Sequence, residues 1–268
     1  GETKELSILF CDIRGFTPIS EQYKTNPQGL TELINRFLTP MTNLIMHNEG
    51  TIDKYMGDCI MAFWNAPLDI TDHRKKAIGS ALRMVDSLKD LNVELAKENK
   101  MPINIGIGIN TGEVVVGNMG SNSRFDYSIL GDAANLASRL EGQSKGYGVT
   151  IILGEDTVKE VEDEYYCVEL DKIAVKGKKE AVTIYTVLST HDYMWHHTDW
   201  ASMDQQHEKF LILYRGQKWM LAEKFANDLA TAWIPMRAYY NVMIDRIENY
   251  KKNPPEENWD GVYRAQTK

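Results

Sequence analysis

The chain has 268 residues, of which 43% are hydrophobic and 25% are charged, and its formal net charge is −8. Such a chain can bury a full core in one large domain, or in one domain with an appendage. No basic block offsets the negative charge, which argues against general nucleic-acid binding but leaves a nucleotide substrate open. No apolar run approaches the ~20 residues of a membrane span.

The three cysteines, Cys11, Cys59 and Cys167, lie in apolar, strand-like runs and show no C-x-x-C spacing. We expect them to be free, buried thiols in a reducing compartment. The first strand-like run begins only a few residues into the chain, so we expect a fragment of a longer protein.

Local patterns predict alternating strands and helices up to about residue 188. Short apolar runs bounded by turn residues predict strands at 5–13, 51–56, 59–64, 103–109, 114–116, 125–130, 149–153, 166–175 and 181–187. Hydrophobic side chains at helical spacing predict helices at 30–45, 77–95, 131–140 and 155–161. Pro40 is expected to kink or split the first of these helices.

Glycines alternate with isoleucines in the strand predicted at 103–109. Gly106 and Gly108 indicate that another backbone or a ligand approaches that face closely. The order of elements favours an α/β (α+β) fold, with one mixed, ferredoxin-like or palm-like sheet and helices packed largely on one face.

The pattern changes after Leu188, so we predict a main domain at 1–190 and a helical extension at 191–268. The extension carries two helical stripes of aromatic and aliphatic residues, separated by a Trp-Ile-Pro-Met segment that starts at Trp233. A single helical-repeat-like unit cannot bury its own apolar face. We therefore expect it to pack on the main domain or on a partner subunit.

Two aspartates end apolar runs in the first part of the chain. Asp12 closes the run at 5–13, and Asp58 lies at the tip of the predicted hairpin. The plain alternative is that each carboxylate only shapes a turn. Two neighbouring carboxylates, however, make a hard oxygen site, and Mg²⁺ commonly combines such ligands with substrate phosphates. We predict a metal site at Asp12 and Asp58.

Three motifs give the chain a family resemblance. They are F-x-D-I-x-G-F-T from Phe10, D-K-x-x-G-D-x-x-M-A from Asp53, and G-D-x-x-N-x-A-S-R-L-E from Gly131. In this order and spacing they resemble the class III nucleotidyl cyclase catalytic domain, over roughly Glu5 to Leu188. The resemblance implies the fold of that family and the conversion of a nucleoside triphosphate to a 3′,5′-cyclic nucleotide and pyrophosphate.

The resemblance also implies a metal centre and a set of transition-state residues. Asp12, Asp58 and the carbonyl of Ile13 would hold two Mg²⁺ or Mn²⁺ ions, which activate the ribose 3′-hydroxyl for in-line attack on the α-phosphate. Asn135 and Arg139, four residues apart on one helix face, would orient the ribose and stabilise the α-phosphate. A surface arginine with a helix-capping asparagine is the plain alternative.

Base choice is implied by Lys54 and Ser128. Lys54 stands where adenylate cyclases carry lysine and typical guanylate cyclases carry glutamate, and a cation can donate to N1 of adenine. The partner position usually carries aspartate, or threonine in one bacterial subgroup. Ser128 keeps a hydroxyl there, which fits the threonine subgroup but discriminates less firmly than a carboxylate. We expect ATP as substrate, with some turnover of GTP.

Lys176 matches the family lysine that meets the triphosphate, although Lys178 or Lys179 could take its place. In the family the metal ligands of one chain face the base-reading and transition-state residues of the other. Because this chain contains both sets, the resemblance implies a symmetric homodimer with two equivalent sites and an inactive monomer.

Several alternatives stay open at this point. A guanylate or mixed-specificity cyclase differs only in base choice, whereas a catalytically silent regulatory dimer should have lost a motif Asp, Asn or Arg, and none is missing. A diguanylate cyclase is disfavoured because the hairpin lacks its Gly-Gly-Asp/Glu-Glu-Phe turn. The extension resembles the tail of bacterial cyclases with upstream membrane helices, which implies a cytoplasmic catalytic domain in a parent protein anchored in the inner membrane.

Overall fold

The computed structural model describes residues 1–175, 180–197 and 199–264, without the side chains of residues 195 and 197. Its elements are β1 (Glu2–Ile13), α1 (Phe16–Glu21), α2 (Pro27–His47), β2 (Thr51–Met56), β3 (Cys59–Trp64), α3 (His73–Lys97), β4 (Ile105–Ser121), β5 (Arg124–Leu130), α4 (Asp132–Gln143), η1 (Lys145–Tyr147), β6 (Ile151–Gly154), β7 (Tyr165–Ile173), β8 (Val182–Thr190), α5 (His191–His197), α6 (Trp200–Arg215), α7 (Trp219–Ala232), η2 (Ile234–Met236) and α8 (Arg237–Lys252).

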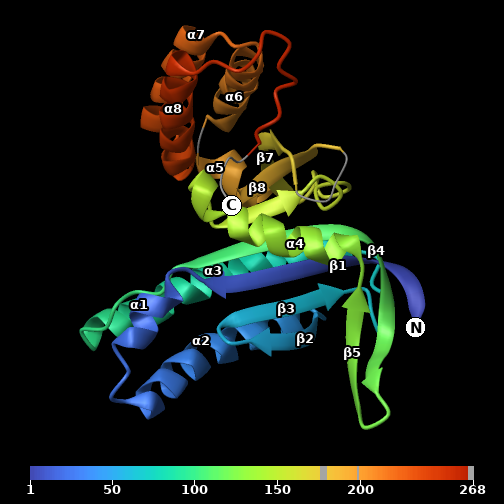
Figure 1. The fold of residues 1–268 in the computed structure, drawn as a ribbon. Coiled ribbons are helices and arrows are strands. Elements are labelled where there is room, and N and C mark those ends of the chain that lie inside the picture. Colours follow the sequence, from blue (N-terminus) through green and yellow to red (C-terminus); the bar gives the residue numbers. More distant parts are fainter. Residues whose placement is uncertain (176–179, 198, 265–268) are drawn as a thin grey trace.

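The strands of these described ranges form one eight-stranded mixed sheet, as predicted (Figure 1). Its order is β2-β3-β1-β4-β6-β8-β7, and β5 pairs with the distal part of β4. β1 lies between β3 and β4 and is antiparallel to both, whereas β4 and β6 are parallel. The C-terminal end of β1 therefore lies beside the start of β3, where the β2–β3 hairpin turns.

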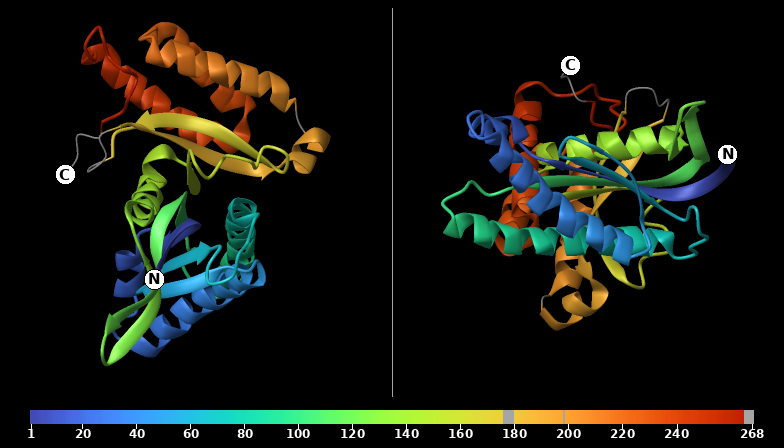
Figure 2. Two further views of the ribbon diagram at one scale, coloured as in Figure 1. Left: turned by 90° about the vertical axis from the view of Figure 1, so that its right-hand side faces the viewer. Right: turned by 90° about the horizontal axis from the view of Figure 1, so that it is seen from below.

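Helices cover both faces of the sheet, whereas the sequence predicted them largely on one face (Figure 2). α2 and α3 pack on one face, where Phe37 and Ala81 join Leu9 and Ile107 in a buried cluster. α2 runs without a break through Pro40, so the helix is not split there. No helix of the described ranges has the length and apolar character needed to cross a membrane.

α4 covers part of the opposite face at very short range. A Cβ atom at Gly108 would lie 2.2 Å from the amide nitrogen of Glu141, and one at Gly106 would lie 2.4 Å from Oγ of Ser144. The expected close approach of another backbone is thus confirmed, and it comes from α4. Side chains here would push α4 away from the sheet.

Two local predictions are wrong. The strands expected at 103–109 and 114–116 are one continuous strand, β4, because β1 pairs with it from Glu2 to Ile13. The helix expected at 155–161 is absent, and this described segment forms turns. Thr157 there is fully buried and bonds Thr111 and the carbonyl of Ile109.

The C-terminal helices pack on the same chain and share a core with β7 and β8. Leu170 and Ile184 of the sheet lie in one buried cluster with Phe210 and Tyr239 of the helices. The first predicted helical stripe is two helices, α6 and α7, divided at Gly216. We call residues 191–264 the C-terminal unit.

Candidate active site

Asp12 and Asp58 come together at one edge of the sheet, as predicted. The antiparallel pairing of Cys11 with Ile60 brings the end of β1 to the β2–β3 turn that carries Asp58. The Ile13 N–H donates to Oδ2 of Asp58 at 3.1 Å, and the two carboxyl groups lie within hydrogen-bonding reach of each other. The Ile13 carbonyl as a ligand stays a prediction.

One carboxyl oxygen of Asp12 is unsatisfied. Its Oδ1 atom is buried and has no hydrogen-bond partner among the residues that the structure describes. Burial, followed by the hydrogen bond and the negative charge of Asp58, raises the pKa of Asp12 from 3.8 to about 7. A divalent cation would satisfy this oxygen and reverse that cost, so the donor set fits Mg²⁺ or Mn²⁺.

Two carboxylates cannot complete the coordination of such an ion. In the parts of the chain that the structure describes, no group of three or more His, Cys, Asp or Glu side chains could hold a metal. The remaining ligands would have to be backbone carbonyls, waters or substrate phosphates, which is the usual arrangement for Mg²⁺ in phosphoryl-transfer sites.

Arg14 and Glu141 border the acidic pair, and the sequence analysis did not single them out. Burial, and the charge of Asp58, raise the pKa of Glu141 on α4, while Arg14 lowers it. Arg14 donates through Nη2 to the carbonyl of Val149 at 2.6 Å and to Oγ of Ser144 at 3.0 Å. Both residues stand inside the quoted motifs, but their placement depends on α4 packing onto the sheet.

The two nearby thiols are not reactive groups. Burial, with the charges of Asp12, Glu141 and Asp58, raises the pKa of Cys59 to about 12. Burial likewise raises the pKa of Cys11 well above its usual value. Both are free cysteines, as expected, and they stay protonated at neutral pH.

Lys54 and Ser128 are joined through a residue that the sequence analysis gave no role. Asp53 forms a bulge in β2, and its side chain is fully buried. Ser128 on β5 donates to Oδ2 of Asp53 at 2.8 Å, and Nζ of Lys54 lies 3.3 Å from Oδ1. One feature of the sequence could have pointed to Asp53: it is a charged residue directly before Lys54 in an otherwise strand-like run.

Asn135 and Arg139 lie on α4, which begins after Gly131. Asn135 is exposed and lies one turn inside the helix, so it does not cap it. Arg139 is half-buried, and its Nη1 atom is buried with no hydrogen-bond partner in the described ranges 1–175, 180–197 and 199–264. A guanidinium in this state is ready to receive an anion. Lys176, with Lys178 and Lys179, lies outside the described residues.

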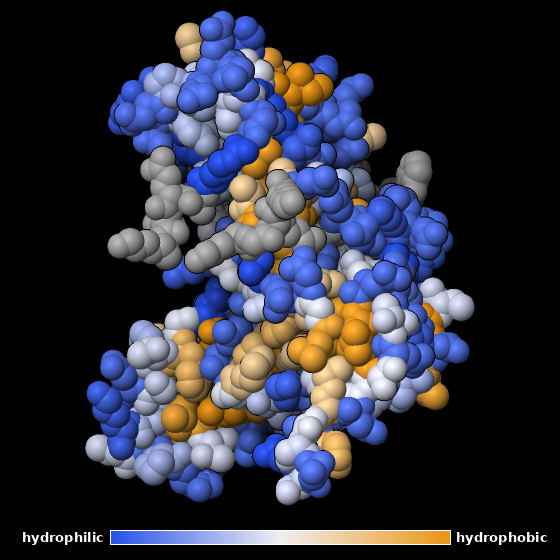
Figure 3. Space-filling model, turned by 45° about the vertical axis from the view of Figure 1, so that its right-hand side comes forward, coloured by the Kyte–Doolittle hydropathy of each residue, from blue (hydrophilic) through white to orange (hydrophobic). Residues whose placement is uncertain are grey.

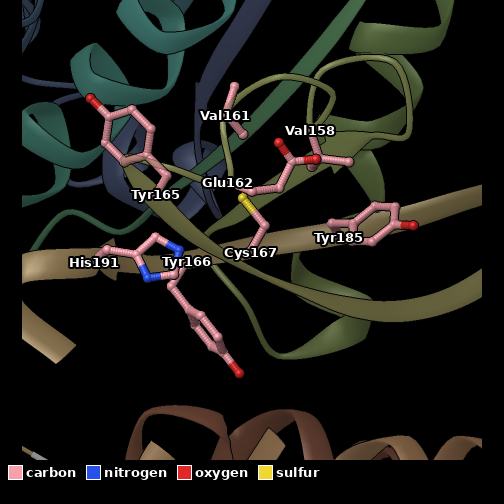
Figure 4. Close-up of a pocket in the computed structure, with 8 residues that line it drawn as sticks. All are labelled: Val158, Val161, Glu162, Tyr165, Tyr166, Cys167, Tyr185 and His191. Carbon is pink, nitrogen blue, oxygen red and sulfur yellow. The ribbon is translucent and has the colours of Figure 1, made fainter. Parts of the chain in front are cut away.

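Two cavities lie elsewhere, beside Tyr166 and His191. One of about 370 Å³ is lined by Cys167 and Tyr185 of β7 and β8 (Figure 4). The other, of about 440 Å³, reaches Trp200. None of the candidate site residues lines either cavity, and both lie away from the carboxylate pair.

Residues 1–189 match the family described as the adenylate and guanylate cyclase catalytic domain. The match covers more than half of the chain, and the chain belongs to this family. Residues 190–268, which hold the C-terminal unit, lie outside it.

Individual relatives give the same result. An adenylate cyclase of Anabaena cylindrica is 38% identical over 192 residues, which cover 69% of this chain and 37% of that protein. The chain therefore spans little more than a third of that relative. The solved adenylyl cyclase CyaB of P. aeruginosa is 36% identical with a TM-score of 0.66, over 70% of this chain and 95% of that one. The guanylyl cyclase Cya2 is 33% identical, also with a TM-score of 0.66, over 72% and 95%.

Proposed function

We propose that this chain is an adenylate cyclase domain, which converts ATP to 3′,5′-cyclic AMP and pyrophosphate at sites shared between two copies. The observation that carries the proposal is a pair of incomplete half-sites on one chain. Within the described residues, a buried oxygen of Asp12, beside Asp58, and a buried N–H donor of Arg139 each have no hydrogen-bond partner. Each half lacks what the other half or the substrate would supply.

Asp12, Asp58 and the Ile13 carbonyl would hold two Mg²⁺ or Mn²⁺ ions. When bound, the ions lower the pKa of the ribose 3′-hydroxyl and neutralise charge on the triphosphate. Arg139 would receive the charge that develops on the α-phosphate, because its guanidinium stays charged and donates from a fixed plane. Asn135, exposed on the same helix, would orient the ribose.

The Asp53–Ser128 bond supports ATP over GTP. Because the Ser128 hydroxyl donates its proton to Asp53, its oxygen is left as an acceptor. The exocyclic amino group of adenine donates and would match that oxygen, whereas the carbonyl oxygen of guanine accepts and would not. Lys54, beside Asp53, would donate to N1 of adenine, which guanine presents as a donor.

A specific observation keeps guanylate or mixed-specificity cyclase as the second candidate. The chain is 36% identical to a solved adenylyl cyclase and 33% identical to a solved guanylyl cyclase, so overall similarity does not decide the base. The choice depends on the side chains at Lys54 and Ser128. A silent regulatory dimer has less support, because Asp12, Asp58, Asn135 and Arg139 are all present.

Exposed apolar side chains support assembly into a dimer. Figure 3 shows hydrophobic residues gathered across the lower half of the molecule, which contains β1 to β5. The large side chains exposed there include Tyr55 and Met56 at the tip of β2 and Phe125 and Leu130 on β5. A second copy would bury them while bringing its own half-sites into place. Membrane anchoring of the parent protein stays a prediction from the resemblance of its tail.

The test mixes two inactive variants, Asp12→Asn and Arg139→Ala. With equal amounts, half of the dimers are mixed and each has one intact site, so we expect about one quarter of wild-type activity. Cyclic AMP and cyclic GMP are measured with ATP and GTP, in Mg²⁺ and Mn²⁺, across protein concentration. No recovery on mixing would refute shared sites, and a preference for GTP would select the second candidate.

A further inference from the structure

The C-terminal unit reaches the main sheet through a buried ion pair. Nη1 of Arg246 on α8 lies 2.6 Å from Oδ2 of Asp171 on β7, and Tyr147 donates to the same oxygen at 2.7 Å. The side chain of Asp171 is fully buried, and that of Arg246 is 10% exposed. The guanidinium also lies 3.6 Å from the centre of the Tyr263 ring. These contacts lock α8 to β7 and to Tyr147.

Tyr147 belongs to a tight turn at 144–149 that follows α4. Bonds from Val149 N to Ser144 O at 3.2 Å and from Gly148 N to Lys145 O at 3.1 Å close the turn. Gly148 has a φ of +65°, and a Cβ atom there would lie 2.8 Å from the backbone of Ala238 on α8. The backbone of α8 therefore packs directly on this turn.

The far side of the same turn holds Arg14. The Arg14 side chain donates to the carbonyl of Val149 at 2.6 Å and to Oγ of Ser144 at 3.0 Å. Its Nε atom is buried and has no hydrogen-bond partner within the described residues, so the two bonds from Nη2 to the turn hold the guanidinium. Arg14 directly follows Asp12 and Ile13 in the chain. One path of contacts thus runs from α8, through the turn at 144–149, to Arg14, which directly follows the end of β1 that carries Asp12.

We propose that the C-terminal unit positions the end of β1 at Asp12 and Ile13, with Arg246 and Arg14 as positioning residues at the two ends of this path. The part of this inference that concerns metal binding rests on the proposed function. The family match ends at residue 189, and 70% of this chain covers 95% of the solved CyaB chain. The unit would therefore add to the cyclase domain a brace that acts on the end of β1.

The test measures Mn²⁺ binding by electron paramagnetic resonance and amide hydrogen exchange in the full chain without nucleotide. Arg246→Lys, Tyr147→Phe and Arg14→Gln are each expected to weaken Mn²⁺ binding by about tenfold, as is usual when groups behind metal ligands are changed. In the metal-free protein, exchange should speed up at 12–15 in all three variants.

Two matched controls separate positioning from general support. Arg237→Gln changes an arginine on the same helix that donates to Ala230 and Thr231 within the unit. Arg215→Gln breaks another pair between the unit and the sheet, with Glu169 at 2.6 Å. Both are expected to keep wild-type Mn²⁺ affinity. Equal weakening in Arg215→Gln would overturn the proposal, since any anchor of the unit would then suffice.

A double-mutant cycle decides whether the two ends act through one path. If they do, the Arg14→Gln/Arg246→Lys double variant should be little worse than Arg14→Gln alone, because the path is already broken. Additive losses would overturn the proposal. Should Arg246→Lys not fold, Tyr147→Phe replaces it in the cycle. The exchange measurement needs neither metal nor catalysis. It therefore tests the positioning role of the C-terminal unit separately from the cyclase activity.

Discussion

The chain contains two carboxylate centres, one fully buried at Asp171 and one half-buried at Asp12, that differ in how their charge is compensated. Asp171, between β7 and α8, has both oxygens bonded: Oδ1 receives the Lys172 N–H, and Oδ2 receives Tyr147 and Arg246. Asp12, at the end of β1, faces another carboxyl and keeps one buried oxygen without a hydrogen-bond partner in the described part of the chain. The chain supplies its own cation to the first centre, whereas the proposed function assigns an external cation to the second.

The difference explains why one centre stabilises the fold and the other is suited to chemistry. A buried charge with a fixed partner is costly to break, so Asp171 and Arg246 hold the C-terminal unit in place. Burial raises the pKa of both carboxyls; at Asp171 the charge of Arg246 opposes that rise, whereas at Asp12 the hydrogen bond and charge of Asp58 add to it, so a bound ion would be favoured there.

The largest effect is expected for Asp58→Ala. Loss of one of two metal ligands removes several kcal/mol of transition-state stabilisation, so kcat should fall on the order of a thousandfold. The assay follows cyclic AMP from ATP at saturating Mn²⁺. The exposed Asp86, paired with Lys89 on α3, provides the control variant Asp86→Ala, which should retain activity. Cyclic AMP production that survives Asp58→Ala would end the metal assignment.

Arg246→Met should leave Asp171 buried and uncompensated. We expect the free energy of unfolding to fall by about 3–5 kcal/mol, measured by urea denaturation. Lys251→Met, on the same helix but at an exposed pair with Glu223, should cost at most about 1 kcal/mol. An equal loss in the two variants would show that the buried pair contributes no more to the free energy of unfolding than the exposed pair.

The pH dependence of Asp12 follows from its raised pKa. The folded protein holds this proton up to about pH 7, whereas the unfolded chain releases it near 3.8. Stability contributed by the protonated carboxyl is thus complete below the lower value and is lost as pH rises through the upper one. In EDTA, the Tm of Asp12→Asn minus the Tm of wild type should therefore rise as the pH increases from 4 to 8. A constant difference across that range, seen by calorimetry, would contradict the raised pKa.

The smallest effect concerns base choice. Ser128→Ala removes the acceptor that Asp53 orients, so the ratio of kcat/KM for ATP over GTP should fall on the order of tenfold. Ser138→Ala, at an exposed position of α4, is the matched control. An unchanged ratio in Ser128→Ala would remove Ser128 from the base site.

Sequence patterns predicted what depends on local order along the chain. The hairpin at Gly57 and the apolar run before Asp12 were enough to pair the two aspartates, and helical spacing was enough for α2, α3 and α4. Patterns could not predict β4 as one strand, because its length is decided by pairing with β1 rather than by its own glycines.

Residues whose importance comes from tertiary packing were missed. Asp53 is notable only because Ser128 of a distant strand reaches it, and Arg14 only because the turn at 144–149 lies above it. The extension's apolar stripes predicted that it must be covered. They did not indicate whether the sheet of the same chain or a partner would cover it. In the structure, β7 and β8 of the same chain cover it.

The shared core of β7, β8 and the C-terminal unit also constrains evolution. Val168, Leu170 and Ile184 are almost fully buried and lie in one cluster with Phe210 and Tyr239 of the unit. A cyclase domain that ends near residue 189 would present that face to water, and it would need polar side chains there to remain soluble. Large apolar side chains at these sheet positions are therefore expected only where helices such as those of the unit cover them.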